Sequence, residues 1–384
     1  MDAETLRIAW LFPSLAFANY WHPILSEFTR SYPRTRVYTG HWPGFSPGFE
    51  DAFTVKIVGA MKFVDTVKSE TGYNEGFIQV SPAIITELLQ FKPNVIFTTG
   101  FCLWTLISIL LKPIGGWRVV IAYEGSAPGV DYRNSQIRLF LRRFMTRFTD
   151  AFITNSLAGK DYLTQYLQVS ERAVFAQPYE VSDPTALLKR TESVNLNISQ
   201  LHRPIFLFTG QLIPRKGLQQ LLEACNLLQR QGYCNYTVLI AGDGLQLEEL
   251  QEFSRAHGLE DSVKWLGWVG YEKLGAYFRQ VDVFILPTLE DTWGMVILEA
   301  MAFGKPILCS KWAGASELVI EGENGYLFDP YQPEEIAFAM RRMIDQPSLI
   351  EKLGRCSQDS ISQHTPVAAA QFLSQVTHTV VGAM

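Results

Sequence analysis

One acidic residue, Glu299, stands inside a run of apolar residues, MVILEAMAF (295–303). Its neighbours would be apolar on every side of a helix, which predicts a buried helix. A carboxylate taken out of water without a partner is costly. We therefore expect Glu299 to be neutralised, to form a structural ion pair, or to face a ligand that carries hydroxyl groups or positive charge.

The loop before this helix holds a second acidic residue, Asp291, eight positions ahead of Glu299. An aspartate in this place is often simply the N-cap of the following helix. The next residues, Thr292, Trp293 and Gly294, would present backbone N–H groups to a ligand at the helix start. Capping and ligand binding by Asp291 are compatible, so both interpretations stay open.

A candidate anion site lies upstream in GQLIPRKG (210–217). Gly210 and Gly217 let the backbone approach a ligand closely, and the helix that begins here offers free N–H groups. Arg215 and Lys216 add two positive charges, which favours phosphate binding. The segment matches neither the Walker pattern nor a complete dinucleotide fingerprint, and the alternative is a surface basic pair beside a turn glycine.

The elements that must position these residues follow an alternating pattern. Short β-branched or aromatic runs with amphipathic stretches between them indicate parallel sheets covered by helices. The runs are 7–12, 36–42, 94–100, 119–125, 151–156 and 173–178 in the first half, and 205–210, 236–242, 263–268, 281–287 and 305–310 in the second. We predict an α/β protein with two doubly wound, Rossmann-like domains that face each other across a ligand-binding cleft.

The predicted domains span 1–195 and 196–360, and a C-terminal helix at 361–384 would return to the first domain. The chain has 384 residues with a net charge of −5, which argues against wholesale nucleic-acid binding. Five widely spaced cysteines fit a reduced cytoplasmic protein without structural zinc, and the N-terminus does not resemble a secretory signal. The uncharged window 94–111 divides into a β-like run and an apolar helix, so we expect no transmembrane helix there.

The residues around Glu299 form a longer pattern. Seven residues separate Asp291 from Glu299 in DTWGMVILE, and AMAFGKPIL, GASELV (314–319) and GENGYLF (322–328) follow. Together these motifs resemble the nucleotide-binding domain of retaining family 4 glycosyltransferases of GT-B fold, the glycogen-synthase-like and phosphatidylinositol-mannosyltransferase-like group. The resemblance covers residues 205–345, with weaker echoes at 92–100 and 149–163.

The resemblance implies a role for each motif residue. Glu299 would bind the ribose hydroxyls of a sugar nucleotide, and Asp291 would contact the transferred sugar. Arg215 and Lys216 would neutralise the diphosphate leaving group, where electrostatic stabilisation matters most. The further donor-binding residues that it implies are Gly210, Trp268, Trp293, Gly294, Met295 and Val296. For Trp268, which would lie near the base, a core position is an equal alternative.

The first half carries the acceptor side in this family. Many members have a His-Gly dipeptide where this chain has Glu124-Gly125, and Glu124 ends an apolar strand. We predict that Glu124 contacts the acceptor or acts as its base, with a solvated strand end as the alternative. His22 is a weaker candidate, because a lone histidine beside aromatic residues more often serves packing.

One helix of the first half is unusually basic. The segment 133–148 contains five arginines, and four apolar residues fall on one helical face: Ile137, Leu141, Phe144 and Phe148. In one interpretation this face packs on the sheet and the arginines are solvated. In the other, the basic face docks on an anionic lipid surface and brings the enzyme to a lipid-linked acceptor.

The sequence thus predicts a retaining, metal-independent hexosyltransferase. It would use a UDP- or GDP-sugar as co-substrate, with no other cofactor, and an acceptor hydroxyl on a glycan, a lipid-linked molecule or a small molecule. The alternatives are a GT-B epimerase or hydrolase of sugar nucleotides, and a pseudoenzyme that only binds them. The expected setting is polysaccharide or glycolipid biosynthesis in the cytoplasm, at most peripheral to the inner face of a membrane.

Overall fold

The computed structural model describes residues 3–15, 20–46, 48–67, 73, 75–181 and 200–382. The described chain forms two compact units. One unit holds the residues up to Val181 together with those from His364 onward, and the other holds the residues from 200 to Gln363. The predicted domain boundary between 195 and 196 lies outside the described residues.

The first unit is built on a seven-stranded sheet with the order β3-β2-β1-β6-β7-β8-β9. Its strands are β1 (Ile8–Phe12), β2 (Thr35–Thr39), β3 (Thr54–Ile57), β6 (Val95–Thr99), β7 (Arg118–Ala122), β8 (Ala151–Thr154) and β9 (Val174–Ala176). All neighbours pair in parallel. The strand order grows outward from β1 in both directions, which is the doubly wound arrangement that the sequence predicts.

Alternate residues of the central strands bury opposite faces of this sheet. Ala9 and Leu11 pack with the apolar side chains of α2 (Ile84–Phe91) and α3 (Leu103–Gly115). Trp10 instead meets Trp21 of α1 (Trp21–Ser31), with ring centroids 5.0 Å apart. The period of two along a strand explains why these runs are apolar throughout, since both faces are covered.

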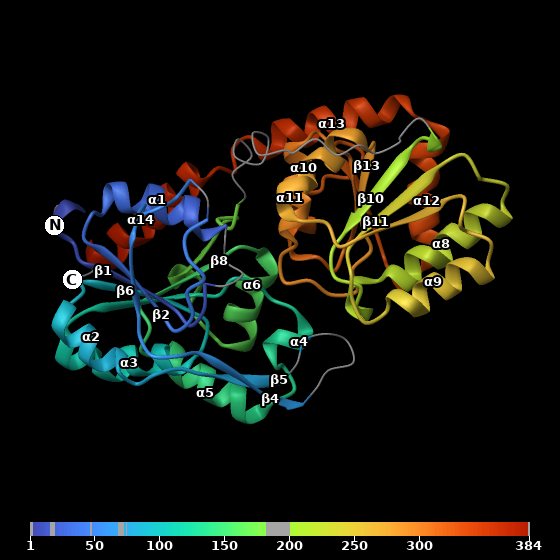
Figure 1. The fold of residues 1–384 in the computed structure, drawn as a ribbon. Coiled ribbons are helices and arrows are strands. Elements are labelled where there is room, and N and C mark those ends of the chain that lie inside the picture. Colours follow the sequence, from blue (N-terminus) through green and yellow to red (C-terminus); the bar gives the residue numbers. More distant parts are fainter. Residues whose placement is uncertain are drawn as a thin grey trace. The chain divides into compact units, whose positions relative to one another are not determined.

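The C-terminal helix α14 (Pro366–Gly382) completes the first unit by lying beside α1 (Figure 1). The hydroxyl of Tyr32 lies 3.2 Å from the Nε2 atom of His378. The rings of Tyr179 and Phe372 stack with centroids 5.9 Å apart. The last helix therefore shares a core with elements from the beginning of the chain.

The second unit has a six-stranded parallel sheet with the order β12-β11-β10-β13-β14-β15. The strands are β10 (Ile205–Thr209), β11 (Thr237–Ala241), β12 (Val263–Gly267), β13 (Val283–Leu286), β14 (Ile307–Ser310) and β15 (Gly325–Phe328). The strand order reverses direction between β10 and β13. Ligands of doubly wound sheets bind at such a reversal, outside the carboxyl ends of the strands.

Helices cover this second sheet (Figure 1). They are α8 (Leu218–Arg230), α9 (Leu247–Ala256), α10 (Tyr271–Gln280), α11 (Met295–Ala302), α12 (Pro333–Asp345) and α13 (Ser348–Ile361). α8 packs against α12, and α11 packs against α13. The apolar residues predicted at helical spacing after Gly217 are buried in α8.

Sequence patterns missed four strands. β3 lies at the sheet edge with mostly exposed residues, and β4 (Lys62–Val67) and β5 (Glu75–Gln79) form a separate antiparallel hairpin. β15 is a four-residue edge strand that begins at a glycine. β3 is largely exposed and so lacks the continuous apolar run that marks the central strands, whereas β15 is mostly buried but only four residues long.

The uncharged window 94–111 divides as predicted into β6 and α3. Within the part of the chain that the structure describes, no helix is both long and apolar enough to span a bilayer.

The basic helix α5 (Gln136–Thr146) does not pack on the sheet through the apolar face that the sequence predicts. Ile137 is 76% exposed, and Leu141, Phe144 and Phe148 are exposed too. Arg142 points inward, where it donates to the Tyr162 hydroxyl at 2.7 Å. The prediction that the apolar face packs on the sheet and the arginines are solvated is therefore wrong. Buried oxygen acceptors hold this guanidinium, and the apolar face is left in solvent.

Candidate active site

Two loops meet at the carboxyl ends of β10 and β13. The backbone N–H of Leu289 donates to the carbonyl of Arg215 at 2.7 Å, and the buried Thr288 hydroxyl donates to the same oxygen at 2.8 Å. Gly217 permits this approach, since a Cβ atom there would lie 1.9 Å from the carbonyl oxygen of Pro287. Its φ of +69° also favours glycine. The sequence motifs 210–217 and 286–306 thus form one site.

This contact brings two cations to one carboxylate. Lys216 forms an ion pair with Asp291, and the Nη1 atom of Arg215 lies 3.9 Å from the same carboxylate oxygen. The side chains of Arg215 and Lys216 are only 13% and 14% exposed. The alternative of a surface basic pair is therefore wrong. Two cations and one acid thus lie together in a mostly buried cluster, where charged groups interact more strongly than in water.

Asp291 is anchored by a neighbouring loop. Its backbone N–H donates to the carbonyl of Trp312 at 3.2 Å, and its carbonyl accepts from Gly314 at 3.0 Å. A Cβ atom on Gly314 would lie 2.2 Å from the carbonyl oxygen of Thr292, so glycine is needed for this close packing. The GASELV motif therefore serves to hold the loop that carries Asp291.

The helix α11 begins at Gly294 and not at Asp291. Gly294 is the N-cap, with a φ of +99°, and no side chain caps the helix. The N-cap interpretation of Asp291 is thus wrong, because its carboxylate pairs with Lys216. The first N–H groups of α11, on Met295 and Val296, meet no capping side chain and suit an anion. The indole of Trp293 is buried, so its backbone would be the part near a ligand.

Glu299 lies in the buried middle of α11, where the residue is 6% exposed. Burial raises the pKa of Glu299 from its ordinary value near 4.5 to about 7, and a hydrogen bond from Tyr271 opposes this rise. No ion pair to Glu299 occurs among the described residues, so the structure gives no support to the interpretation as a structural ion pair. The sequence reasoning missed Tyr271, whose position after Gly270 carries no distinctive signal.

Trp268 follows the last residue of β12 and is 76% exposed. The alternative of a core aromatic is therefore wrong. Its exposed ring leaves a face on which a base could stack. Gly210, the first residue after β10, lies at the same edge of the sheet.

In the first unit, Glu124 lies two residues beyond β7. Its carboxylate accepts hydrogen bonds from the Trp21 indole at 3.3 Å and from the Tyr20 hydroxyl at 3.5 Å. Burial raises its pKa, and a hydrogen bond from Glu180 opposes the rise. Glu124 is thus not a solvated strand end. Glu180 was missed, although a lone acid between Tyr179 and Val181 gives the signal that singled out Glu299.

His22 is fully buried on α1. Its Nδ1 atom accepts from the backbone N–H of Ser46 at 2.9 Å, and its ring packs beside Trp42, Phe45 and Phe53. Burial lowers its pKa, so the ring is neutral. The structure thus places His22 in an aromatic core.

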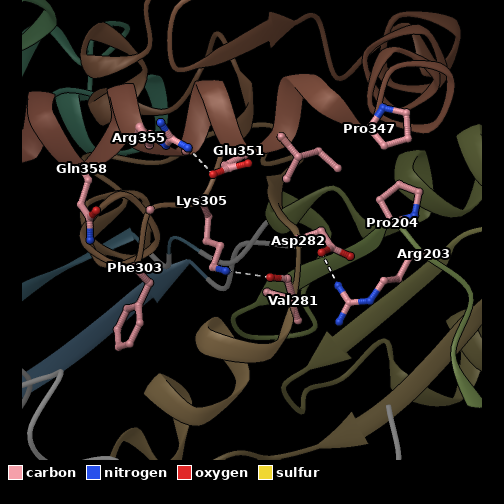
Figure 2. A pocket seen from close by; sticks show the side chains of 13 residues that line it. Arg203, Pro204, Val281, Asp282, Phe303, Lys305, Pro347, Glu351, Arg355 and Gln358 are labelled. Atoms are coloured by element: carbon pink, nitrogen blue, oxygen red, sulfur yellow. Dashed lines mark hydrogen bonds and ion pairs between the residues drawn. The ribbon is translucent and has the colours of Figure 1, made fainter. Parts of the chain in front are cut away.

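A cavity of about 550 Å³ lies at the opposite, amino-terminal edge of the second sheet (Figure 2). Its charged side chains bond within the cavity wall: Arg203 with Asp282, Arg355 with Glu351, and Lys305 with the carbonyl of Val281. None of the predicted site residues lines this cavity. Separately, no cluster of three or more His, Cys, Asp or Glu suited to a metal occurs within the described ranges.

Comparison with known sequences identifies the second unit. Residues 190–360 match the sequence model of the family "Glycosyl transferases group 1". Alpha-D-kanosaminyltransferase of Streptomyces kanamyceticus is 32% identical over 152 residues, which is 39% of this chain and 39% of that protein. D-inositol 3-phosphate glycosyltransferase of Streptomyces griseus is 32% identical over 156 residues, 38% of this chain and 33% of that protein. The matches thus span well under half the length of these relatives.

Comparison with solved structures covers both units. HepE of Anabaena, solved in complex with UDP, has a TM-score of 0.75, with 97% of this chain and 100% of that chain covered at 19% identity. Sucrose-phosphate synthase of Thermosynechococcus elongatus has a TM-score of 0.76 over 99% of this chain and 100% of that chain at 18% identity. Both likenesses concern the fold, two Rossmann-like domains with parallel sheets. The chain therefore carries a domain of the glycosyl transferases group 1 family at residues 190–360, and its fold is that of GT-B glycosyltransferases.

Proposed function

We propose that this protein is a retaining glycosyltransferase that moves a hexose from a nucleotide diphosphate sugar to an acceptor hydroxyl. The observation that supports the proposal most is one cluster at the carboxyl ends of β10 and β13. There Arg215 and Lys216 share a single carboxylate, Asp291, while the buried Glu299 has no basic partner among the described residues. Such a site offers cations to a phosphate group and a carboxylate to hydroxyl groups.

The donor's parts match these groups in charge and hydrogen bonding. The diphosphate would bind Arg215, Lys216 and the uncapped N-terminus of α11. The ribose hydroxyls would donate to Glu299, and the base would stack near the exposed Trp268. The UDP bound by HepE, a protein of the same fold, makes UDP the first nucleotide to test.

The chemical step needs a stabilised leaving group. The bond between the sugar C1 atom and the diphosphate oxygen breaks, and its electron pair stays on the diphosphate. The acceptor oxygen bonds to C1 on the same face, and its proton passes to the leaving phosphate oxygen. Lys216 and Arg215 stabilise the growing negative charge, and Asp291 holds the transferred sugar. Because two cations and a helix N-terminus already face the diphosphate, the reaction requires no metal cofactor.

The test is incubation of the purified protein with UDP-glucose and other nucleotide sugars, in EDTA, with and without sugar acceptors. Transfer supports the proposal, and UDP binding alone without turnover would favour a pseudoenzyme. Fast epimerisation or hydrolysis of the donor, at a rate that no acceptor changes, would favour an epimerase or hydrolase of sugar nucleotides. Failure of every nucleotide diphosphate to bind would overturn the assignment of this site.

The same proposal includes contact with an anionic membrane through α5. Ile137, Phe140 and Phe144 form an exposed apolar surface, and the exposed Arg147 adds positive charge at its end. Apolar and basic groups on one helix suit the boundary of an anionic bilayer. Attraction of about 1 kcal/mol per basic residue would give reversible binding.

Co-sedimentation with phosphatidylglycerol and with phosphatidylcholine vesicles tests this contact. Binding to the anionic vesicles only is expected, and an Ile137→Gln, Phe140→Gln variant should lose it. Leu245→Gln is the matched control, because Leu245 is 95% exposed in the other unit. Equal absence of binding to both vesicles would indicate an acceptor that is not held in a membrane.

A further inference from the structure

A buried and a partly buried carboxyl group of the first unit contact each other. The side chains of Glu124, beyond β7, and Glu180, beyond β9, form a hydrogen bond. A carboxylate can only accept hydrogen bonds, so this contact requires a proton on one of the two groups. Burial, and then the charge of Glu124, hold the pKa of Glu180 well above its ordinary range. Burial raises the pKa of Glu124 as well, but less than that of Glu180, so Glu180 is the group that retains the shared proton to higher pH.

Asn155 fixes the two segments that carry this pair. Its Nδ2 group donates to the carbonyl of Glu124 at 2.8 Å. Its Oδ1 atom accepts from the backbone N–H groups of Tyr179 at 3.1 Å and Glu180 at 2.8 Å. Asn155 is itself fully buried directly after β8. Asn155 thus holds together the two chain segments that carry the carboxyl groups.

Besides Glu180, two neutral donors contact the Glu124 carboxylate, Tyr20 and Trp21, at long distances of 3.5 and 3.3 Å. No ion pair to Glu124 occurs in the described part of the chain. A carboxylate has about four acceptor positions. Beside Glu180 and these two donors, Glu124 therefore retains capacity for another hydrogen bond. That capacity points toward a ligand with a good neutral donor.

A cavity of about 320 Å³ adjoins Glu124. It is lined by Phe12, Ser14, Tyr20, His41, Met61 and Thr99. Phe12 and Thr99 end β1 and β6, the neighbours between which the strand order reverses, so the cavity occupies the ligand position of a doubly wound sheet. Hydroxyl groups and an imidazole beside aromatic carbon are suited to a sugar or another polyol, and the volume fits a single small ring.

We propose that Glu124 and Glu180 share one proton and work as a unit, in which Glu180 positions the Glu124 carboxylate to accept a hydrogen bond from a neutral polyol acceptor in this cavity. The inference rests on the proposed function, because it names the acceptor class of that transfer. Glu124 touches the acceptor, whereas Glu180 acts through Glu124.

The pair gives distinct expectations for two substitutions at position 180. Glu180→Gln keeps an N–H donor toward Glu124, as the protonated carboxyl does, while Glu180→Ala removes it. At alkaline pH the wild type would lose the shared proton, and two adjacent carboxylates would repel each other. The other titratable groups that face the pair and the cavity are Tyr20, Tyr179 and His41. An alkaline loss of activity that disappears in Glu180→Gln therefore belongs to the pair and not to these groups.

The first measurement is binding of D-glucose and myo-inositol to the full chain by saturation-transfer NMR, without donor. Glu124→Gln and Glu180→Ala should each weaken binding roughly tenfold, as expected for the loss of a hydrogen bond to a charged group. Glu180→Gln should restore most of it. Glu171→Gln, an exposed glutamate of the same unit, is the matched control. The second measurement is the pH profile of UDP release from UDP-glucose with the sugar that binds.

Each outcome decides the inference. The inference is supported if polyol binding depends on Glu124, if Glu180→Gln binds the polyol nearly as well as the wild type, and if the alkaline loss of activity is absent in Glu180→Gln. Absence of polyol binding, or equal binding by all variants, overturns it, as does binding of D-glucosamine alone, which would indicate an ammonium site. UDP binding by calorimetry is read separately: intact UDP binding with failed polyol binding rejects only this inference, whereas absent UDP binding rejects the proposed function.

Discussion

Replacing Glu299 by glutamine distinguishes what this residue contributes to folding stability from what it contributes to ligand binding. The amide keeps the side-chain volume and the contact with Tyr271 but cannot ionise. Glu299 has a folded-state pKa of about 7 against an ordinary value near 4.5. A carboxyl whose pKa is raised by folding favours the folded state below its unfolded pKa. That contribution is lost as the pH rises through 7.

The magnitude follows from the separation of the two pKa values. Each pH unit of separation is worth about 1.4 kcal/mol, so ionised Glu299 costs the ligand-free protein roughly 3 kcal/mol above pH 7. Glu299→Gln should therefore be close to neutral at pH 5 and raise Tm by roughly 5 °C or more at pH 8. Ligand binding should show the opposite preference. A ribose that donates to the carboxylate favours the ionised form, so Glu299→Gln should weaken UDP binding roughly tenfold at pH 8.

The assay combines thermal unfolding and UDP calorimetry at pH 5 to 8, with Glu252→Gln, an exposed glutamate of α9, as the control. The ratio of wild-type to variant UDP affinity should fall by about tenfold between pH 8 and pH 6, because the wild type must then lose a proton to bind. The ratio cancels the titration of the phosphate itself. A ratio near one at every pH would refute the assignment of Glu299 to the ribose.

Three further changes have defined outcomes. Arg215→Ala with Lys216→Ala should weaken UDP at least tenfold more than uridine in parallel titrations, and equal losses would remove the phosphate role. Trp268→Ala should lower UDP affinity about tenfold by loss of stacking, with Tm unchanged because the ring is exposed; unchanged affinity would place the base elsewhere. Gly217→Ala should lower Tm and nucleotide binding together, since its Cβ atom would collide with Pro287, and an unaltered Tm would show that the loops are held in another way.

The sequence predicted the parts of the fold whose residues are buried on both sides. The central strands and α8 were found from continuous apolar runs or helical spacing, and the DTWGMVILE spacing located the α11 site loop. The edge strands β3 and β15 and the hairpin β4–β5 lack such runs. Their existence depends on pairing with distant strands, which a local window does not contain.

The site was predicted in its residue types but not in its pairings. Nothing in the sequence shows that Lys216 pairs with Asp291, 75 positions away, or that Tyr271 reaches Glu299. The face of α5 that follows helical spacing is exposed, because inward hydrogen bonds of Arg142 orient the helix. Tertiary contacts decide which face of a helix is buried, and this explains why charge and periodicity alone predicted the wrong buried face for α5.

Proton NMR of the transfer reaction tests the central claim most directly. The anomeric proton of a UDP-hexose is followed in EDTA together with a sugar acceptor and the wild-type protein. A new anomeric signal with the coupling of the donor's own configuration, absent in the Arg215→Ala, Lys216→Ala variant, is the predicted result. An inverted anomeric signal, or a donor converted only to free or epimerised sugar, would contradict retaining transfer by this site.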